Sequence, residues 1–208
     1  MINAGILTFH EFVMGETLPL ATLQAGVLEF LKQRDDAILF GAQAVNAWVN
    51  EPRMTQDIDL LSNRAADLAE ELRIWLAERF QIAVRIREVK AGLDRIYQLQ
   101  KSGNRHLINI RAVATLPPAE RIEQVLVLTP PALIAQKVIA FYQRRGKPKS
   151  GTDWRDIAML LLAFPELKVD AGQVTQQLIA ANASSEILTV WQDLVHQTIQ
   201  PVEEDDDF

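Results

Sequence analysis

The stretch from residue 40 to 61, FGAQAVNAWVNEPRMTQDIDLL, places the strongest constraint on the fold and chemistry of this chain. A turn of small residues, Gly41 and Ala42, opens an apolar segment, and Asp57 and Asp59 follow with one apolar residue between them. Residues i and i+2 of a β-strand point to the same face, so both carboxylates project from one side. Paired carboxylate oxygens suit a hard divalent cation such as Mg²⁺. The sequence therefore predicts a magnesium site here.

Hydrophobic periodicity predicts the secondary structure around this stretch. Helices are expected at 18–32, 43–49 and 65–80, and strands at 37–40, 57–61, 83–89, 95–100, 105–113 and 125–128. Turns are expected at 91–94 and 102–104. After the double proline at 130–131, apolar residues recur every three or four positions and predict helices at 131–144, 153–163, 171–181 and 185–198.

These elements predict an α+β protein. Residues 1–128 are expected to form an α/β core with an N-terminal helix, and residues 129–200 a C-terminal helical region packed on that core. The last segment, 201–208, contains five consecutive acids and is expected to be a disordered acidic tail.

Composition excludes several classes of function. A net charge of −6 argues against a protein that coats nucleic acid without specificity. The absence of cysteine and the wide separation of the three histidines disfavour a zinc site. The sequence begins without the pattern of a signal peptide and has no run of about 18 apolar residues, so we expect a cytoplasmic protein with no membrane partner.

Positive charge is concentrated in two segments. Residues 79–111 carry eight Lys or Arg against two acids, and a predicted loop carries Arg144, Arg145, Lys147 and Lys149. Both could be ordinary solvated surface, or surfaces that face phosphate, the loop then contacting an RNA backbone. Trp154, just after this loop, is expected in the core.

The central motif resembles the signature of the nucleotidyltransferase superfamily that includes DNA polymerase beta. It is most similar to the prokaryotic AbiEii-type toxins and minimal nucleotidyltransferases. The matching positions are Gly41, Ala42, Arg53, Thr55, Asp57, Ile58, Asp59 and Leu60, with a looser downstream match at Lys137, Arg155 and Asp156. The resemblance implies a nucleotidyltransferase-like mixed β-sheet flanked by helices, followed by a C-terminal helical region.

The resemblance also implies a separate role for each pair of residues at the site. Asp57 and Asp59 would hold Mg²⁺ (or Mn²⁺) ions that bridge the phosphates of an NTP substrate, and such ions stabilise the attacking and leaving oxygens in an in-line displacement. The backbone amides of Gly41 and Ala42 would cradle the β- and γ-phosphates, since a helix N-terminus favours negative charge.

Five further residues are open to more than one interpretation. Arg53 and Thr55 could steer phosphate, or Arg53 could form a structural ion pair. Lys137 could place a positive charge on the triphosphate, or be a solvated lysine or a salt-bridge partner. Arg155-Asp156 could match the family pattern, or be charges in the first turn of a helix.

Asn109 departs from the family pattern. The family has a third carboxylate on a neighbouring strand, and the matching strand here is HLINIR, residues 106–111, which places Asn109 at the acidic position. An asparagine offers a metal one neutral carbonyl oxygen and cannot act as a base. Either the strand is misaligned, another acid such as Asp94 or Asp156 substitutes, or catalysis is impaired.

Three hypotheses follow. The first is an enzyme that binds Mg-NTP and transfers a nucleotidyl group to an RNA (tRNA) or protein hydroxyl, as a toxin–antitoxin or phage-defence component. The second is a catalytically impaired member that serves as a nucleotide- or partner-binding module, which Asn109 favours. The third is an aminoglycoside-type enzyme that modifies a small molecule, which an acidic pocket beside the site would favour.

Overall fold

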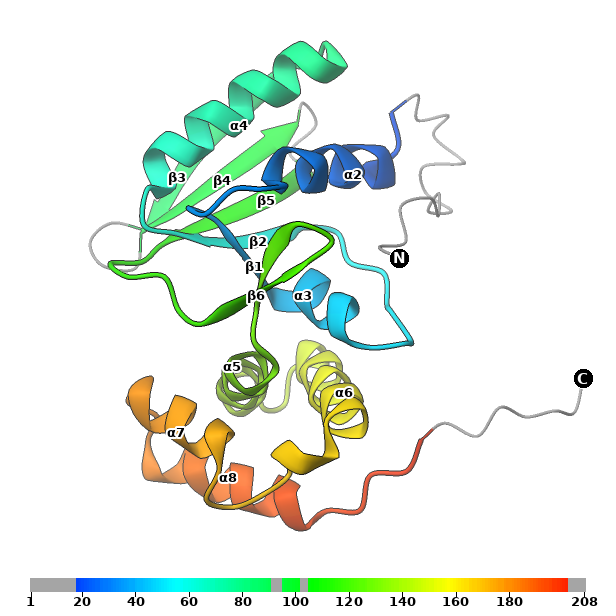
Figure 1. The fold of residues 1–208 in the computed structure, drawn as a ribbon, viewed down its shortest axis with the longest axis vertical. Coiled ribbons are helices and arrows are strands. Elements are labelled where there is room, and N and C mark those ends of the chain that lie inside the picture. Colours follow the sequence, from blue (N-terminus) through cyan, green and yellow to red (C-terminus); the bar gives the residue numbers. More distant parts are fainter. Residues whose placement is uncertain (1–17, 91–94, 102–104, 202–208) are drawn as a thin grey trace, which may run out of the picture. The chain divides into compact units, whose positions relative to one another are not determined.

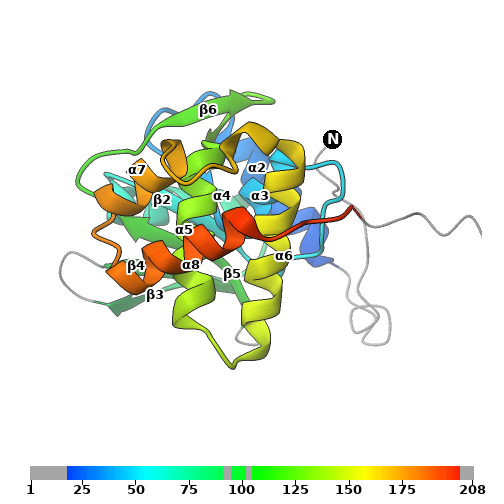
Figure 2. The same ribbon diagram turned by 90° about the horizontal axis from the view of Figure 1, so that it is seen from below.

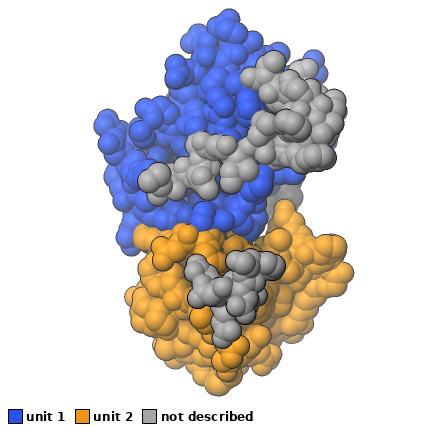
Figure 3. Space-filling model, turned by 90° about the vertical axis from the view of Figure 1, so that its right-hand side faces the viewer, with its two compact units in different colours: residues 1–47, 52–129 blue, residues 48–51, 130–208 orange. Residues whose placement is uncertain are grey.

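The computed structural model describes residues 18–90, 95–101 and 105–201. The turns predicted at 91–94 and 102–104, Asp94, and the acids of the predicted tail lie outside these ranges. The chain divides into two compact units, which Figure 3 colours separately. Unit 1 comprises residues 1–47 and 52–129, and unit 2 comprises residues 48–51 and 130–208.

Unit 1 is built on a mixed sheet in which seven described strands follow the order β3-β4-β5-β2-β1-β7-β6. The strands are β1 (Ile38–Phe40), β2 (Ile58–Ser62), β3 (Val84–Lys90), β4 (Ile96–Lys101), β5 (Arg105–Ala112), β6 (Ala119–Ile122) and β7 (Val125–Leu128). β2 runs parallel to β5 and antiparallel to β1, while β1 runs parallel to β7. This sheet confirms the predicted α+β class, and each predicted strand matches an observed one.

Strand β6 is the strand that the sequence analysis missed. It forms a hairpin with β7 in which Ile122 pairs with Val125, so the turn contains only Glu123 and Gln124. Their φ angles are 46° and 72°. Positive φ at both central residues defines a turn that usually carries Asn-Gly, and Glu-Gln gives no such signal.

The helices of unit 1 are α2 (Leu20–Leu31), α3 (Gly41–Trp48, of which Trp48 groups with unit 2) and α4 (Ala65–Phe80). In Figure 1, α2 and α4 lie together against one face of the sheet, and α4 covers β3, β4 and β5. Leu68, Leu72 and Leu76 recur at a spacing of four, and each is fully buried. The predicted helix at 65–80 is confirmed with its bounds, because this apolar stripe has an α-helical period.

Unit 2 contains α5 (Pro130–Gln143), α6 (Pro148–Ala163), a short 3₁₀ turn η2 (Pro165–Leu167), α7 (Gln173–Ala180) and α8 (Ser185–His196), all visible in Figure 2. The four predicted helices are therefore confirmed, although α6 begins at residue 148 rather than 153. Pro148 occupies the first turn, where a missing N–H costs nothing.

The earlier start of α6 corrects two expectations. Arg155 and Asp156 lie in the middle of the helix, so their interpretation as first-turn charges is wrong. Trp154 is 36% exposed and is not a core residue. The reason is that the buried stripe of α6 runs through Asp153, Asp156, Ile157 and Leu160 instead.

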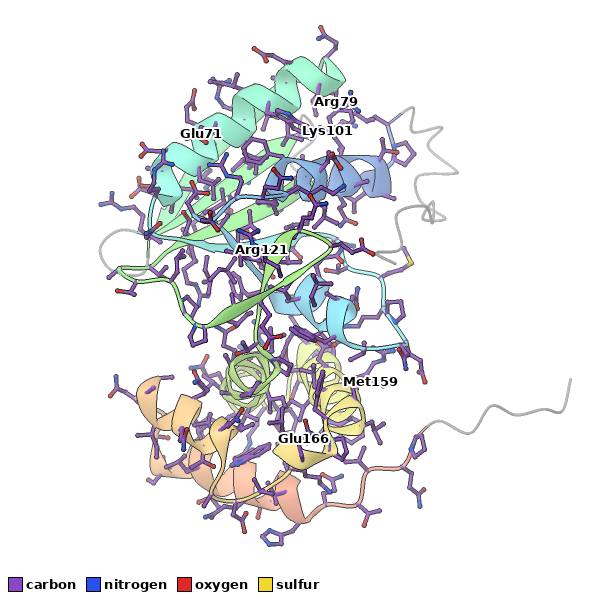
Figure 4. All side chains as sticks on the ribbon, viewed as in Figure 1. Glu71, Arg79, Lys101, Arg121, Met159 and Glu166 are labelled. Carbon is purple, nitrogen blue, oxygen red and sulfur yellow. The ribbon has the colours of Figure 1, made fainter. Side chains whose placement is uncertain are left out.

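A network of four charged side chains joins the segment after α2 to α4. Arg34 donates from Nε and Nη2 to the two carboxylate oxygens of Asp36 at 2.9 and 2.7 Å, and from Nη2 to Glu71 at 2.7 Å. Arg64 also contacts Asp36 and Glu71, at 2.9 and 3.0 Å; Figure 4 labels Glu71 on α4. The Arg34 hydrogen bonds hold the pKa of Asp36 below its ordinary value of 3.8.

This lowered pKa predicts how stability depends on pH. The ionised Asp36 contributes fully above pH 3.8, and its contribution is lost as the pH falls through the lower pKa of the folded state. We expect Asp36→Asn to lower the free energy of unfolding by about 1 kcal/mol at pH 7 and to have little effect below its folded pKa. Urea unfolding of both proteins between pH 7 and acid measures the difference, with Asp193→Asn, at an exposed position on α8, as the control. An equal loss at all pH values would contradict the prediction.

Candidate active site

The site begins where β1 passes directly into α3. Gly41 is the first helical residue and has a φ of +71°, a left-handed conformation that favours glycine. A Cβ atom at this position would overlap Oδ2 of Asp59 and lie 3.0 Å from the Cβ and Cγ of the same residue. Gly41 is therefore required both by its backbone angle and by the close approach of Asp59.

Asp57 and Asp59 converge, as the alternation along β2 predicts. Asp59 pairs across the sheet with Phe40 on one side and with Asn109 on the other. The Nδ2 of Asn109 donates to Oδ2 of Asp57 at 2.8 Å and to Oδ1 of Asp59 at 3.0 Å. One amide group therefore bridges the two carboxylates, beside the turn at Gly41.

The orientation of the Asn109 amide is fixed from its other end. Its Oδ1 accepts a hydrogen bond from Nε2 of Gln98 at 2.9 Å, and Gln98 is its cross-strand partner on β4. Because Nδ2 faces the carboxylates, Oδ1 faces Gln98. The register thus sets Asn109 beside Asp59, with its donor group turned toward the pair.

The segment that leads into β2 is held by two residues that the sequence analysis did not single out. Asn46 on α3 accepts from the backbone N–H of Arg53 at 3.0 Å and donates to the Arg53 carbonyl at 2.7 Å. Gln24 on α2 donates to the carbonyl of Thr55 at 3.0 Å. The Thr55 hydroxyl in turn donates to the carbonyl of Asp57 at 3.3 Å. Thr55 thus has a local role in positioning the backbone of Asp57.

Lys137 belongs to unit 2, where its described contacts are with acids. It is 9% exposed, and its Nζ lies 2.6 Å from Oδ2 of Asp156 and 3.7 Å from Oδ1 of Asp153. Arg144 also contacts Asp153, at 2.8 Å. Of the alternatives considered for Lys137, these contacts match a salt-bridge partner. Its closest partner, Asp156, belongs to the same downstream sequence match as Lys137 itself. Tertiary packing of α5 on α6 makes this pair.

The other predicted positions in unit 2 are also engaged locally. Arg155 donates from Nη2 to the carbonyl of Glu51 at 3.2 Å. In the basic loop, the guanidinium carbon of Arg145 lies 4.6 Å from the centre of the Tyr142 ring. These contacts hold one side of each residue within unit 2.

Asp57 and Asp59 fit a magnesium ion by the chemistry of their donors. Their oxygens share a single polar N–H₂ group, so they meet at a point that favours positive charge. Within the described residues, no three His, Cys, Asp or Glu side chains are grouped to hold a metal. Mg²⁺ at nucleotide sites commonly takes one or two carboxylates and completes its shell with water and substrate phosphates. The pair therefore fits a metal that arrives with a nucleotide.

Comparison with protein families identifies this architecture. The family model described as the nucleotidyl transferase AbiEii toxin of a type IV toxin–antitoxin system matches residues 23–188. The chain belongs to the AbiEii nucleotidyltransferase family. The resemblance read from the motif is thereby confirmed, and the match includes both units of this AbiEii-family protein. A comparison with curated protein sequences gives no match.

Solved structures share the fold of the AbiEii-family protein at low sequence identity. The Megavirus polyadenylate synthase is 11% identical with a TM-score of 0.58, over 76% of this chain and 36% of the viral one. A candidate nucleotidyltransferase from H. pylori is 13% identical with a TM-score of 0.53, over 91% and 96% of the two chains. The chain thus spans about a third of the viral enzyme. No described helix is both long and apolar enough to cross a bilayer.

The geometry at Gly41 predicts the effect of adding one methyl group. Gly41→Ala must adopt a left-handed backbone and displace Asp59, so we expect a loss of about 1–3 kcal/mol in the free energy of unfolding. Gly146→Ala is the matched control, because Gly146 has a φ of +76° with no heavy atom within 4 Å of the added Cβ. Chemical denaturation measures both. An equal cost in the two variants would show that contact with Asp59 contributes nothing.

Proposed function

We propose that this AbiEii-family protein binds Mg-NTP (or Mn-NTP) through Asp57 and Asp59 and transfers a nucleotidyl group to a hydroxyl of an RNA, such as tRNA, or of a protein. The observation that carries the proposal is the sharing of one Asn109 amide by two carboxylates beside the glycine turn. Two negative charges that converge on one point require a cationic or hydrogen-bonding partner, and a metal-bound triphosphate supplies it.

The turn at Gly41 suits the phosphate end of the nucleotide. The first backbone N–H groups of α3 have no partner within the helix, and they start directly at the end of β1 beside Asp59. Such groups and the helix dipole favour an anion. Gly41 and Ala42 are thus proposed to hold the phosphates, while Asn46 and Gln24 hold the segment that carries Arg53 and Thr55.

The proposed reaction is an in-line displacement. The acceptor oxygen forms a bond to the α-phosphorus, the bond from that phosphorus to the bridging oxygen of the β-phosphate breaks, and pyrophosphate leaves. Bound magnesium would supply charge neutralisation. The chain's own residues position the reactants: Asp57 and Asp59 orient the nucleotide, and Asn109 holds both carboxylates in place. Asn109 cannot accept the acceptor's proton, which passes to water.

The proposed biological role follows from the family description. The family model names a toxin of a type IV toxin–antitoxin system. We extend this role to the present chain, as a toxin–antitoxin or phage-defence component that acts on an RNA or protein acceptor.

A second candidate function rests on the same asparagine. The neutral amide of Asn109 turns its donor toward the carboxylates, and a neutral oxygen is a weak metal ligand and no base. The chain could therefore be a catalytically impaired member that binds nucleotide or a partner protein without turnover. The two candidates differ in transfer, not in nucleotide binding.

Removal of both carboxylates tests the nucleotide binding that the two candidate functions share. We expect Asp57→Ala/Asp59→Ala to abolish Mg²⁺-dependent NTP binding, measured by isothermal titration calorimetry or by the NTP-dependent rise in Tm. The control is Asp67→Ala/Glu70→Ala, which removes two exposed carboxylates from α4. Unchanged NTP binding in the first variant would remove the aspartate pair from the site.

Placing a carboxylate at position 109 distinguishes the active enzyme from the catalytically impaired module. We expect Asn109→Asp to tighten Mg²⁺ binding by about tenfold, because a third negative ligand joins the pair, with Gln98 still able to donate to it. The readouts are metal affinity and the transfer of label from α-³²P-NTPs to total tRNA or to protein. Label transfer by the wild type supports the enzyme; transfer only by Asn109→Asp supports the impaired module. Weaker metal binding in Asn109→Asp would contradict the proposed metal position.

A further inference from the structure

The described helices of unit 1 cover one face of strands β3, β4 and β5 and leave the other face open. Side chains alternate along each strand, and Val84, Tyr97 and Leu99 point to the face covered by α4, where they are buried. The alternate positions form the opposite face, which we call the open face. Its polar described members are Arg85, Arg87, Gln98, Gln100, His106, Asn109 and Arg111, and Ile96, which pairs with Arg111, lies on the same face. Arg85, Arg87, His106 and Arg111 are all exposed.

The open face is continuous with the aspartate pair. Arg87 pairs with Gln98, Gln98 with Asn109, and Asn109 with Asp59, so one cross-strand row leads from β3 to the site. Adjacent strands are about 4.8 Å apart, which places the backbone of Arg87 roughly 14 Å from that of Asp59. That distance is within reach of an extended polymer whose end lies at the carboxylates.

The charge of the open face has one sign. Its described residues on β3, β4 and β5 include three arginines and no acid. The only acid of these described strands, Glu88, lies on the α4 side, where it pairs with Arg95 at 3.1 Å. A polyanion is therefore favoured beside the site, whereas a cationic small molecule would be repelled.

We infer that the open face binds the acceptor and that the acceptor is single-stranded RNA. The inference rests on the proposed nucleotidyl transfer and selects RNA from its two acceptor classes. Arginine forks match phosphate oxygens, and Gln98, Gln100 and His106 add donors and acceptors for 2′-hydroxyls and base edges. Arg85, Arg87 and Arg111 lie on three different cross-strand rows, so they can contact successive phosphates of an extended single strand.

The test compares two double variants that lose the same charge. Arg85→Gln/Arg87→Gln removes two arginines from the open face, and Arg73→Gln/Arg79→Gln removes two from α4, where Figure 4 labels Arg79. The probe is a fluorescein-labelled mixed-sequence RNA of about 16 nucleotides, the upper end of common single-strand site sizes. Fluorescence anisotropy gives the affinity at salt concentrations from about 50 to 200 mM.

We expect the open-face variant to bind RNA at least about tenfold more weakly, with a plot of log affinity against log salt whose slope is smaller by about 1.4. The α4 variant should match the wild type. The single variant Arg85→Gln should show about half of the change in slope. Absence of RNA binding by the wild type, an equal loss in both double variants, or label transfer to protein but not to RNA would overturn the inference.

Nucleotide binding separates this inference from the proposed function. The open-face variant should retain Mg²⁺-dependent NTP binding, since both substitutions lie on β3, three strands from Asp59. The variant Asp57→Ala/Asp59→Ala should lose NTP binding and retain RNA binding. Loss of RNA binding by the open-face variant therefore supports the inference even if the aspartates prove not to bind nucleotide.

Discussion

The amide of Asn109 is the interaction on which the site depends. Two carboxylates separated by one residue would repel each other, and the Asn109 N–H₂ group satisfies both at once. Gln98 fixes that amide from the next strand, so three neighbouring strands are joined by side chains as well as by the backbone. The same contacts turn the donor group of Asn109 toward the carboxylates, so the proposed function treats nucleotide binding and turnover as separate predictions.

Sheet topology explains why this small region can combine a glycine turn, the proposed metal-binding pair and the proposed acceptor surface. Strand β2 lies between β1 and β5, so Asp59 has the glycine turn on one side and Asn109 on the other. The helices α2 and α4 cover one face of the sheet and bury its apolar residues. The row of polar residues that leads from Arg87 to Asp59 then lies on the opposite face. A single alternation of side chains thus provides both the core and the surface beside the site.

The sequence predicted the regular elements well where one signal dominated. α4 was predicted from a leucine stripe, and β2 from its alternation. Prediction failed where the local sequence carried no recognisable signal for the structure that forms. The turn of the β6–β7 hairpin has positive φ at Glu123 and Gln124 without a glycine, and the start of α6 depends on Pro148. Gln98 carried no motif of its own, because its importance comes only from the strand beside it.

The sequence by itself determined the α+β class, the family resemblance and the convergence of Asp57 and Asp59, since all three follow from local periodicity and a short motif. The tertiary structure alone decided which group faces the aspartates, because Asn109 is 52 residues away from Asp57 and meets it only through strand register. It also decided that Lys137 pairs with Asp156, since helix packing desolvates both charges and each then needs the other. Local patterns fix which way a side chain points, whereas its partner depends on which segment folds against it.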